Sequence, residues 1–134
     1  MPSFSDVTIS GAPPEEVWKL LYDPARFPDW WAGIGTVEVG GGDGGGSGGE
    51  YTMYPEGYPD FPMGQLLRTE RDERRVTVSC LVSDLSFQWR LEPMPEGTRI
   101  SVEVEIPEAE GHRLEAQRAT IRASLRRLAA LAAN

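Results

Sequence analysis

Residues 9–31 read ISGAPPEEVWKLLYDPARFPDWW. The Pro-Pro pair can begin a helix, because proline presets the backbone of the first turn and has no N–H to leave without a partner there. Val17, Leu20 and Leu21 then recur at helical spacing. Pro24 ends this helix, since a proline disfavours helical geometry in the residue before it, and it can begin a second short helix. The segment therefore predicts a strand, two short helices and a Trp-Trp pair in succession.

The composition predicts a single globular domain over residues 1–134. Apolar residues make up 40% of the chain and charged residues 25%, as in an ordinary globular protein. No apolar run approaches the ~20 residues that span a bilayer, and the N-terminus lacks the pattern of a signal peptide, so we expect no stable membrane insertion. Cys80 is the only cysteine, which excludes an intramolecular disulfide and favours a cytoplasmic location. The oligomeric state, monomer or homodimer, is left open.

The net charge of −8 argues against nucleic acid as a partner, because the neutralisation of phosphates needs a basic surface. The charge is unevenly distributed along the chain. Residues 112–127 contain five Arg and one Glu, net +4, so the rest of the chain carries −12. This basic segment either docks on the acidic body of the protein or meets an anionic ligand.

Residues 40–49 contain eight glycines in ten positions. Burial cannot offset the entropy of ordering such a segment, so we expect a flexible loop that connects two strands. A phosphate-binding loop is disfavoured, because no Gly-Lys-Ser/Thr sequence follows it. A domain boundary is also disfavoured, since the preceding residues are too few for a core of their own.

Downstream of this loop, apolar residues alternate with polar ones, which is typical of antiparallel strands with one solvated face. The alternation is clear in three segments, 76–82, 85–91 and 100–106. Short connections between these segments predict a meander of hairpins. Weaker strand patterns bring the expected sheet to about seven strands; they cover residues 4–10, 34–39, 50–54 and 65–72.

The longest predicted helix covers residues 112–133. An amphipathic helix of this kind packs on one face of a twisted sheet. The predicted fold is therefore α+β: an antiparallel sheet wrapped around a long C-terminal helix, with two short helices between the first and second strands. The apolar stripe of the long helix recurs at helical spacing and consists of Leu114, Ile121, Leu125, Leu128 and Ala132.

Several short motifs accompany this order of elements: PEEVW at 14–18, Asp23-Pro24, Trp30-Trp31, RRV at 74–76, WRLEP at 89–93 and GTR at 97–99. Together they resemble the SRPBCC (START/Bet v 1-like) superfamily with its helix-grip fold, and especially the polyketide cyclase/dehydrase branch. The resemblance covers essentially the whole chain. The superfamily places ligand carriers, cyclases and chaperone activators on one scaffold, so the motifs indicate the fold more than the activity.

The resemblance implies a deep, largely apolar cavity between the sheet and the C-terminal helix. Near the expected opening this chain departs from typical relatives, because the glycine-rich run 40–49 and a Tyr- and Pro-rich segment follow the second predicted strand. The shape of the cavity mouth is therefore the feature that transfers least from relatives.

Arg118 lies near the apolar stripe of the predicted C-terminal helix, where an unpaired charge is costly. If it faced the cavity, its guanidinium would bind a carboxylate, phosphate or enolate in bidentate fashion. At the edge of the stripe it would instead extend to solvent or pair with a carboxylate on a strand. Both placements stay open, and Arg118 and Ile121 count among the candidate ligand contacts.

Aromatic residues supply further candidate contacts. Trp30, Trp31, Phe87 and Trp89 could form a wall or floor of the cavity, because their rings offer large apolar surfaces. In each of the pairs Trp30/Trp31 and Phe87/Trp89, we expect at least one ring to pack in the core. Both roles therefore stay open for these four residues.

The segment MYPEGYPDFPMG at 53–64 adds Met53, Tyr54 and Phe61 to the candidates. Its three prolines exclude a regular central strand. Its apolar side chains suit either a lid over the cavity mouth or a rigid loop that caps the core.

No residue pattern indicates a catalytic centre, a metal site or a cofactor. His112 is the single histidine and stands at the start of the predicted helix, and Cys80 lies in an apolar strand. With one histidine and one cysteine, no zinc cluster is expected. We also find no pair of carboxylates with catalytic spacing.

We therefore expect a protein that binds a small hydrophobic molecule, polyketide- or lipid-like, in its cavity. Catalysis as a polyketide cyclase/dehydrase stays open: the cavity would fold and desolvate a polyketone while Arg118 or a tyrosine polarises a carbonyl. The alternatives are a carrier or sensor without chemistry and a protein-interaction module of the chaperone-activator type. An enzyme should place titratable groups with shifted pKa values in the cavity, whereas an interaction module should have a collapsed cavity and an exposed apolar patch.

Overall fold

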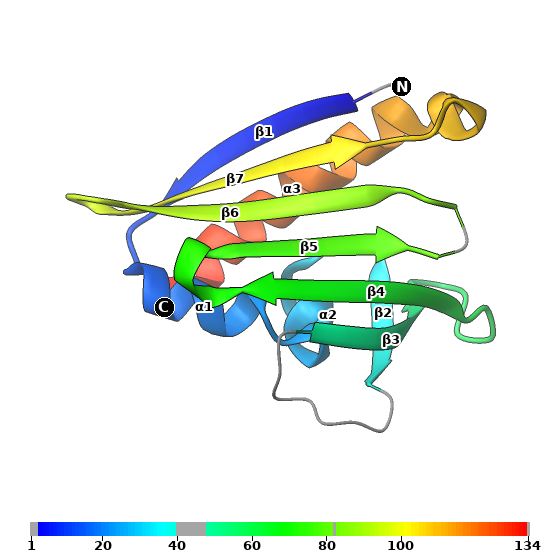
Figure 1. The fold of residues 1–134 in the computed structure, drawn as a ribbon, viewed down its shortest axis with the longest axis horizontal. Helices are drawn as coiled ribbons and strands as arrows, with labels where there is room; N and C mark the ends of the chain where they lie inside the picture. The colour runs from blue at the N-terminus through cyan, green and yellow to red at the C-terminus, as the bar shows by residue number, and fades with distance from the viewer. Residues whose placement is uncertain (1–2, 40–47, 82, 134) are drawn as a thin grey trace.

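The computed structural model describes residues 3–39, 48–81 and 83–133. Within these residues, seven strands form one antiparallel sheet, and a long helix crosses one of its faces (Figure 1). The strands are β1 (Ser3–Ser10), β2 (Ile34–Val39), β3 (Gly48–Pro55), β4 (Met63–Glu70), β5 (Arg75–Cys80), β6 (Ser86–Met94) and β7 (Gly97–Glu105). The α-helices are α1 (Pro14–Leu21), α2 (Phe27–Trp30) and α3 (Leu114–Ala132), and the 3₁₀ helices are η1 (Pro24–Arg26), η2 (Arg71–Glu73) and η3 (Glu108–Arg113). None of the described helices is both long and apolar enough to cross a membrane.

The strand order is β1-β7-β6-β5-β4-β3-β2, so the first two strands of the chain lie at opposite edges of the sheet. α1, η1 and α2 carry the chain from one edge to the other. The strands from β2 to β7 follow one another as neighbouring antiparallel pairs. This arrangement confirms the predicted meander and the two short helices between the first and second strands.

Both α1 and η1 begin at a proline, as the sequence predicts. α1 begins with Pro14, and the residue that ends it, Tyr22, donates its N–H to the Trp18 carbonyl. Asp23 then accepts a hydrogen bond from the Ala25 N–H at 3.0 Å and begins η1. The chain therefore turns within two residues, and α2 follows at once.

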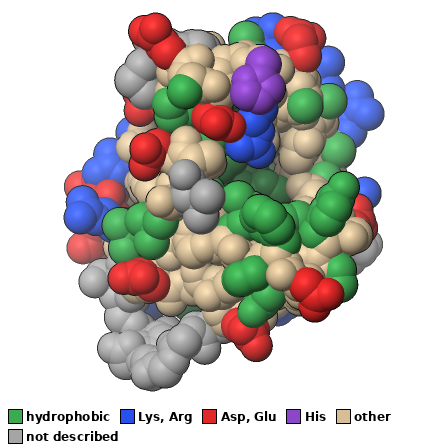
Figure 2. All heavy atoms as spheres, turned by 90° about the vertical axis from the view of Figure 1, so that its right-hand side faces the viewer, with side chains coloured by type: hydrophobic (Ala, Val, Ile, Leu, Met, Phe, Trp, Pro, Cys, Tyr) green, Lys and Arg blue, Asp and Glu red, His purple; other side chains and the backbone are tan. Residues whose placement is uncertain are grey.

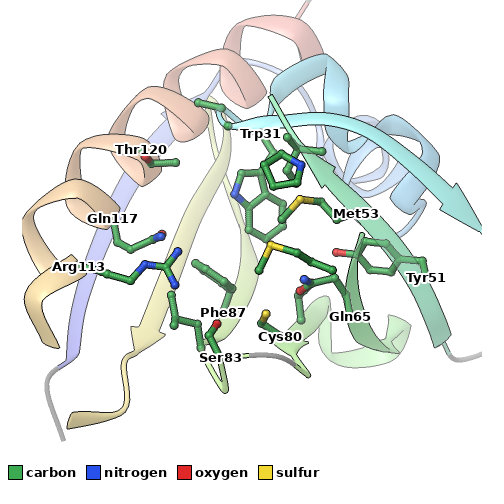
Figure 3. A pocket seen from close by; sticks show the side chains of 17 residues that line it. Trp31, Tyr51, Met53, Gln65, Cys80, Ser83, Phe87, Arg113, Gln117 and Thr120 are labelled. Atoms are coloured by element: carbon green, nitrogen blue, oxygen red, sulfur yellow. The ribbon is translucent and has the colours of Figure 1, made fainter. Parts of the chain in front are cut away.

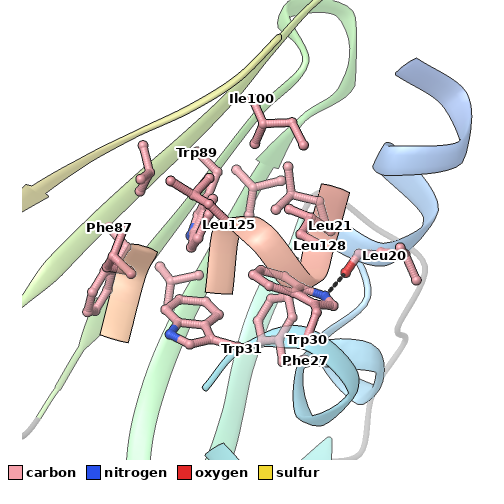
Figure 4. Close-up of a cluster of buried hydrophobic side chains, with 14 of the residues drawn as sticks. Leu20, Leu21, Phe27, Trp30, Trp31, Phe87, Trp89, Ile100, Leu125 and Leu128 are labelled. Atoms are coloured by element: carbon pink, nitrogen blue, oxygen red, sulfur yellow. Dashed lines mark hydrogen bonds between the residues drawn. The ribbon is translucent and has the colours of Figure 1, made fainter. Parts of the chain in front are cut away.

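The core lies between the sheet and the helices. Alternate residues of β5, β6 and β7 are buried, and the residues between them are more exposed. α3 contributes Ile121, Leu125 and Leu128, each no more than 2% exposed. Aromatic rings from α2 and β6 lie beside them (Figure 4). Trp30 is fully buried among these rings, and its Nε1 donates a hydrogen bond to the Leu20 carbonyl at 2.9 Å.

The predicted glycine-rich loop is shorter than expected at its C-terminal end. β3 begins at Gly48, so Gly48 and Gly49 belong to a strand that pairs with Arg68 and Leu67 of β4. Backbone pairing with β4 offsets the low strand propensity of glycine. The remainder of that loop, residues 40–47, lies outside the described part of the chain.

Other boundaries also differ from expectation by a few residues, and three of them have a clear reason. The strand predicted over 65–72 runs from Met63 to Glu70, because η2 turns the chain beyond it. The long helix begins at Leu114, since η3 winds the preceding residues more tightly. β5 ends at Cys80, and Val82, which the alternation had included, lies outside the described residues.

Gly97 should not tolerate a side chain. Its φ is +145°, and a Cβ there would overlap the Ser10 carbonyl oxygen and lie 2.9 Å from the Cα of Gly11. Gly97→Ala should therefore lower the free energy of unfolding by about 3 kcal/mol in urea denaturation. Gly57→Ala is the matched control: its φ is +85° with nothing within 4 Å, so only about 1 kcal/mol of backbone strain is expected. Equal losses in the two variants would contradict the steric argument.

Candidate functional site

A cavity of about 240 Å³ opens between the sheet and the N-terminal part of α3. Figure 2 shows a hollow bordered by apolar side chains on this side of the molecule. The apolar lining consists mainly of Trp31, Ile34, Met53, Met63, Val78, Leu85 and Phe87. The hydrogen-bonding side chains and one thiol in the lining are Tyr51, Gln65, Cys80, Ser83, Arg113, Gln117 and Thr120.

Strand pairing places three of these side chains in a row. Gln65 of β4 lies directly opposite Tyr51 of β3 on one side and Cys80 of β5 on the other. Directly paired residues point to the same face of a sheet. The hydroxyl, the amide and the thiol therefore line one wall of the cavity, as Figure 3 shows.

Gln65 is the unusual member of this row. Gln65 is only 3% exposed, and its Nε2 has no hydrogen-bond partner among the described residues. A buried donor without a partner costs about 1–3 kcal/mol. A hydrogen-bond acceptor on a bound molecule would remove this cost.

Tyr51 stays neutral at ordinary pH. It is 4% exposed, and its ring packs edge-on against Phe27 with the centroids 5.7 Å apart. Burial, with a smaller contribution from the charge interaction with Cys80, raises the pKa of Tyr51 far above its ordinary value. Its hydroxyl can therefore donate or accept a hydrogen bond but does not act as a base.

The opposite wall comes from η3 and α3. Arg113, Gln117 and Thr120 are spaced four and three residues apart, so they share one face of the helix. The guanidinium of Arg113 and the amide of Gln117 point into the cavity (Figure 3). Arg113 Nη1 also donates to Glu110 Oε1 at 3.1 Å. No Asp, Glu or His is found among the lining residues that the structure describes, so Arg113 supplies the charge of this wall.

Three of the residues predicted from the sequence as ligand contacts line the cavity: Trp31, Met53 and Phe87. The rings of Trp31 and Phe87 meet edge to face, with centroids 5.1 Å apart and planes inclined by 81°. Met53 approaches from β3. These side chains give the cavity a mostly apolar boundary on the side of the core.

Trp30, Trp89 and Ile121 lie in the core and do not line the cavity. All three are fully buried. Trp31, which does line the cavity, stacks on Trp30 at 5.4 Å and meets Trp89 at 5.2 Å, so both rings contact a lining residue without lining the cavity themselves. The prediction that these three residues contact a ligand is therefore corrected: they belong to the hydrophobic core beside the cavity.

Segment 53–64 divides between two paired strands and an exposed loop. Tyr54 follows Met53 on β3 and so points to the other face of the sheet, where its hydroxyl donates to Glu38 Oε1 at 2.8 Å. Phe61 lies in the connecting loop and is 57% exposed. Neither ring lines the cavity. Of the two alternatives for this segment, the rigid loop that caps the core is wrong, because the aromatic side chains of the loop face solvent.

Arg118 lies outside the cavity. It is exposed, and its guanidinium sits over the ring of Phe4, 5.6 Å from the centroid, in a groove between β1 and α3. One residue along a helix rotates the side chain by about 100°, which turns Arg118 away from the face that carries Gln117. The ligand clamp considered for Arg118 is therefore replaced by the solvent-facing alternative.

Among the polar residues of the lining, Tyr51, Gln65, Arg113 and Gln117 were not predicted from the sequence as ligand contacts. For Gln65 a signal was available, because alternation along β4 places this polar residue on the same strand face as the buried Leu67. For Arg113 and Gln117 no such signal existed. Which flank of a long helix borders a cavity depends on where the helix crosses the sheet.

Comparison with known proteins places this architecture in context. The family model described as polyketide cyclase/dehydrase and lipid transport matches residues 1–133. The ZhuI aromatase/cyclase from Streptomyces sp. R1128 superposes with a TM-score of 0.83 at 14% identity, over 98% of this chain and 93% of its own. Protein CV1439 from Chromobacterium violaceum superposes with a TM-score of 0.74 at 26% identity, over 98% and 97% of the two chains. A search of curated protein sequences finds no match.

The di-domain ARO/CYC BexL from the BE-7585A biosynthetic pathway is also similar in structure. Its TM-score is 0.78 at 17% identity, over 96% of this chain and 45% of its own. Identities this low show a shared fold. The expected α+β helix-grip architecture, with its sheet around a C-terminal helix, is thereby confirmed.

The raised pKa of Tyr51 predicts a loss of stability at high pH. The unfolded phenol loses its proton near pH ~10, whereas the folded protein keeps it. Above that pH the folded state binds more protons, so its stability falls by about 1.4 kcal/mol per pH unit. Urea unfolding at about pH 8 and about pH 11 measures this loss. Tyr51→Phe should lack this contribution and the exposed Tyr58→Phe should retain it; identical pH dependence in wild type and Tyr51→Phe would refute the assignment.

Proposed function

The chain belongs to the SRPBCC superfamily, in its polyketide cyclase/dehydrase and lipid transport branch, and from this premise we propose that its cavity binds one small, largely apolar molecule. The observation that carries the proposal is the cavity itself, open on one side and walled by Trp31, Phe87 and other apolar side chains. Ligand sites are typically concave and apolar, with a few polar groups that fix the orientation of the bound molecule.

The volume of the cavity limits the size of the ligand. About 240 Å³ exceeds the roughly 150 Å³ of an engineered apolar cavity that binds benzene. It lies just below the roughly 300–1,000 Å³ of sites for drug-sized molecules. These limits favour a ligand of one or two rings, and a long polyketide or a two-chain lipid would extend beyond the mouth.

The lining favours binding over acid–base catalysis. A general acid or base works best with a pKa near the working pH, and the described lining residues include no Asp, Glu or His. The raised pKa of Tyr51 keeps its hydroxyl protonated. The open cavity also argues against a protein-interaction module, for which a collapsed cavity was expected. A carrier or sensor of a small molecule is therefore the leading candidate.

Cyclisation of a short polyketone is the second candidate. Two observations favour it: the likeness in fold to aromatase/cyclases, and the donors at Tyr51 and Arg113, which could polarise a carbonyl in a desolvated cavity. Incubation with a short poly-β-ketone separates the two candidates. A carrier returns the compound unchanged, whereas a cyclase accelerates ring closure and loses rate in Tyr51→Phe.

Filling the cavity should abolish binding. Thr120 of α3 lines the cavity, so Thr120→Phe should project a ring into it and weaken the binding of 2-naphthol by at least about tenfold, or about 1.4 kcal/mol. Quenching of tryptophan fluorescence measures this affinity, because Trp31 lines the same cavity. Native mass spectrometry of the purified protein tests in parallel for a retained small molecule.

Ala119→Phe is the matched control, because it adds the same ring one residue earlier, in the outer groove beside Arg118. It should bind 2-naphthol as the wild type does. If neither 2-naphthol nor a retained molecule is detected, or if both variants bind equally, the cavity is not the binding site.

A further inference from the structure

The polar groups of the cavity lie on two opposite walls. Gln65 belongs to the sheet, in one row with Tyr51, and Arg113 belongs to the junction of η3 and α3. Figure 3 shows the Gln65 amide and the Arg113 guanidinium on opposite sides of the cavity, with the side chains of both directed toward its interior. A molecule that fills the cavity therefore meets a hydrogen-bonding wall at one end and a cationic wall at the other.

The two walls differ in the chemistry that they accept. Gln65 Nε2 is a neutral donor without a partner among the described residues, so it needs a neutral acceptor such as a carbonyl oxygen. Tyr51, directly opposite Gln65 on β3, adds a hydroxyl that stays protonated. A carboxylate would be poorly placed there, because the charge would be buried without a cation.

Arg113 suits an anion. Its Nη1 bonds Glu110 Oε1 at 3.1 Å, and both side chains of this pair are about one-third exposed. A guanidinium has five N–H donors, so a single bond to Glu110 leaves donors for a second carboxylate. The described lining holds no acidic residue to occupy them, and Gln117 adds an amide beside the guanidinium.

The space between the walls suits a flat ring. Trp31 and Phe87 meet edge to face at 5.1 Å, and aromatic rings add offset or edge-to-face contacts readily. Met53 and Met63, with unbranched and adaptable side chains, complete this part of the lining.

From these contacts we propose that the ligand is a small aromatic acid: its carboxylate binds Arg113, and a carbonyl-type acceptor at the far side of the ring binds Gln65 Nε2. The inference rests on the proposed function, because it names the class of molecule that the same cavity takes. It goes further by assigning one ligand group to each wall. No reaction is required of either residue.

Three probes of nearly equal shape test the assignment. 4-Acetylbenzoate carries both groups, 4-acetylbenzamide lacks the negative charge, and 4-isopropylbenzoate replaces the carbonyl oxygen by a methyl group. Isothermal titration calorimetry with wild-type protein should rank 4-acetylbenzoate first. Loss of the charge should weaken binding by about tenfold or more, and loss of the acceptor by about fivefold.

Two variants test which residue causes each preference, for the acetyl group over isopropyl and for the acid over the amide. Gln65→Leu should remove the preference for acetyl over isopropyl and keep the preference for acid over amide. Arg113→Met should do the reverse. Gln65→Leu should also raise the stability of the free protein to urea, because it removes a buried donor without a partner; this readout shows that the variant folds.

The outcomes separate this inference from the proposed function. A fourth probe, 4-isopropylbenzamide, lacks both the carboxylate and the acetyl group. If it binds wild type as tightly as 4-acetylbenzoate, the assignment of the ligand class is overturned while binding in the cavity stands. If either variant alters both preferences equally, the assignment of one group to each wall is overturned. If none of the probes and no 2-naphthol binds, the proposed function itself fails.

Discussion

The stack of Trp31 on Trp30 is the contact on which the cavity depends. Trp30 is held by the hydrogen bond from its Nε1 to the Leu20 carbonyl, which ties α2 to the end of α1. Trp31 stacks on it with centroids 5.4 Å apart and planes inclined by 21°, and it meets Phe87 edge to face. Trp30 and Trp89 lie in the core, whereas Trp31 and Phe87 line the cavity, so these rings form the boundary between the two.

Two buried donors lack partners in the described part of the chain, Gln65 Nε2 and Trp89 Nε1. They differ in their surroundings. Trp89 lies among the rings of Trp30 and Trp31 in the core, whereas Gln65 lines the cavity. An apolar residue at position 65 would stabilise the free protein. A glutamine there is better explained by a bound molecule than by folding, because local rules of consistent packing fail most often at functional sites.

Three arginines of the C-terminal segment lie in two different surroundings. Arg122 lies 3.7 Å from Asp6 of β1, and Arg118 covers the ring of Phe4, so these residues face the acidic body. Arg113, at the other end of the segment, points into the cavity. The pattern of charges along the sequence does not distinguish the arginines that face β1 from the one that faces the cavity. The separation arises because helical rotation and the crossing of α3 over β1 turn successive residues toward different neighbours.

The sequence by itself determined the order of elements and the covered face of the sheet. Prolines at the starts of α1 and η1, period-two alternation in β5, β6 and β7, and the stripe of α3 act through neighbours close in the chain. Only the tertiary structure decided which side chains line the cavity. Trp30 and Trp31 are adjacent in the chain, yet one lies in the core and the other in the wall. Likewise, strand register brings Tyr51, Gln65 and Cys80 into one row from three strands. Such placements depend on contacts between distant segments, which local periodicity does not encode.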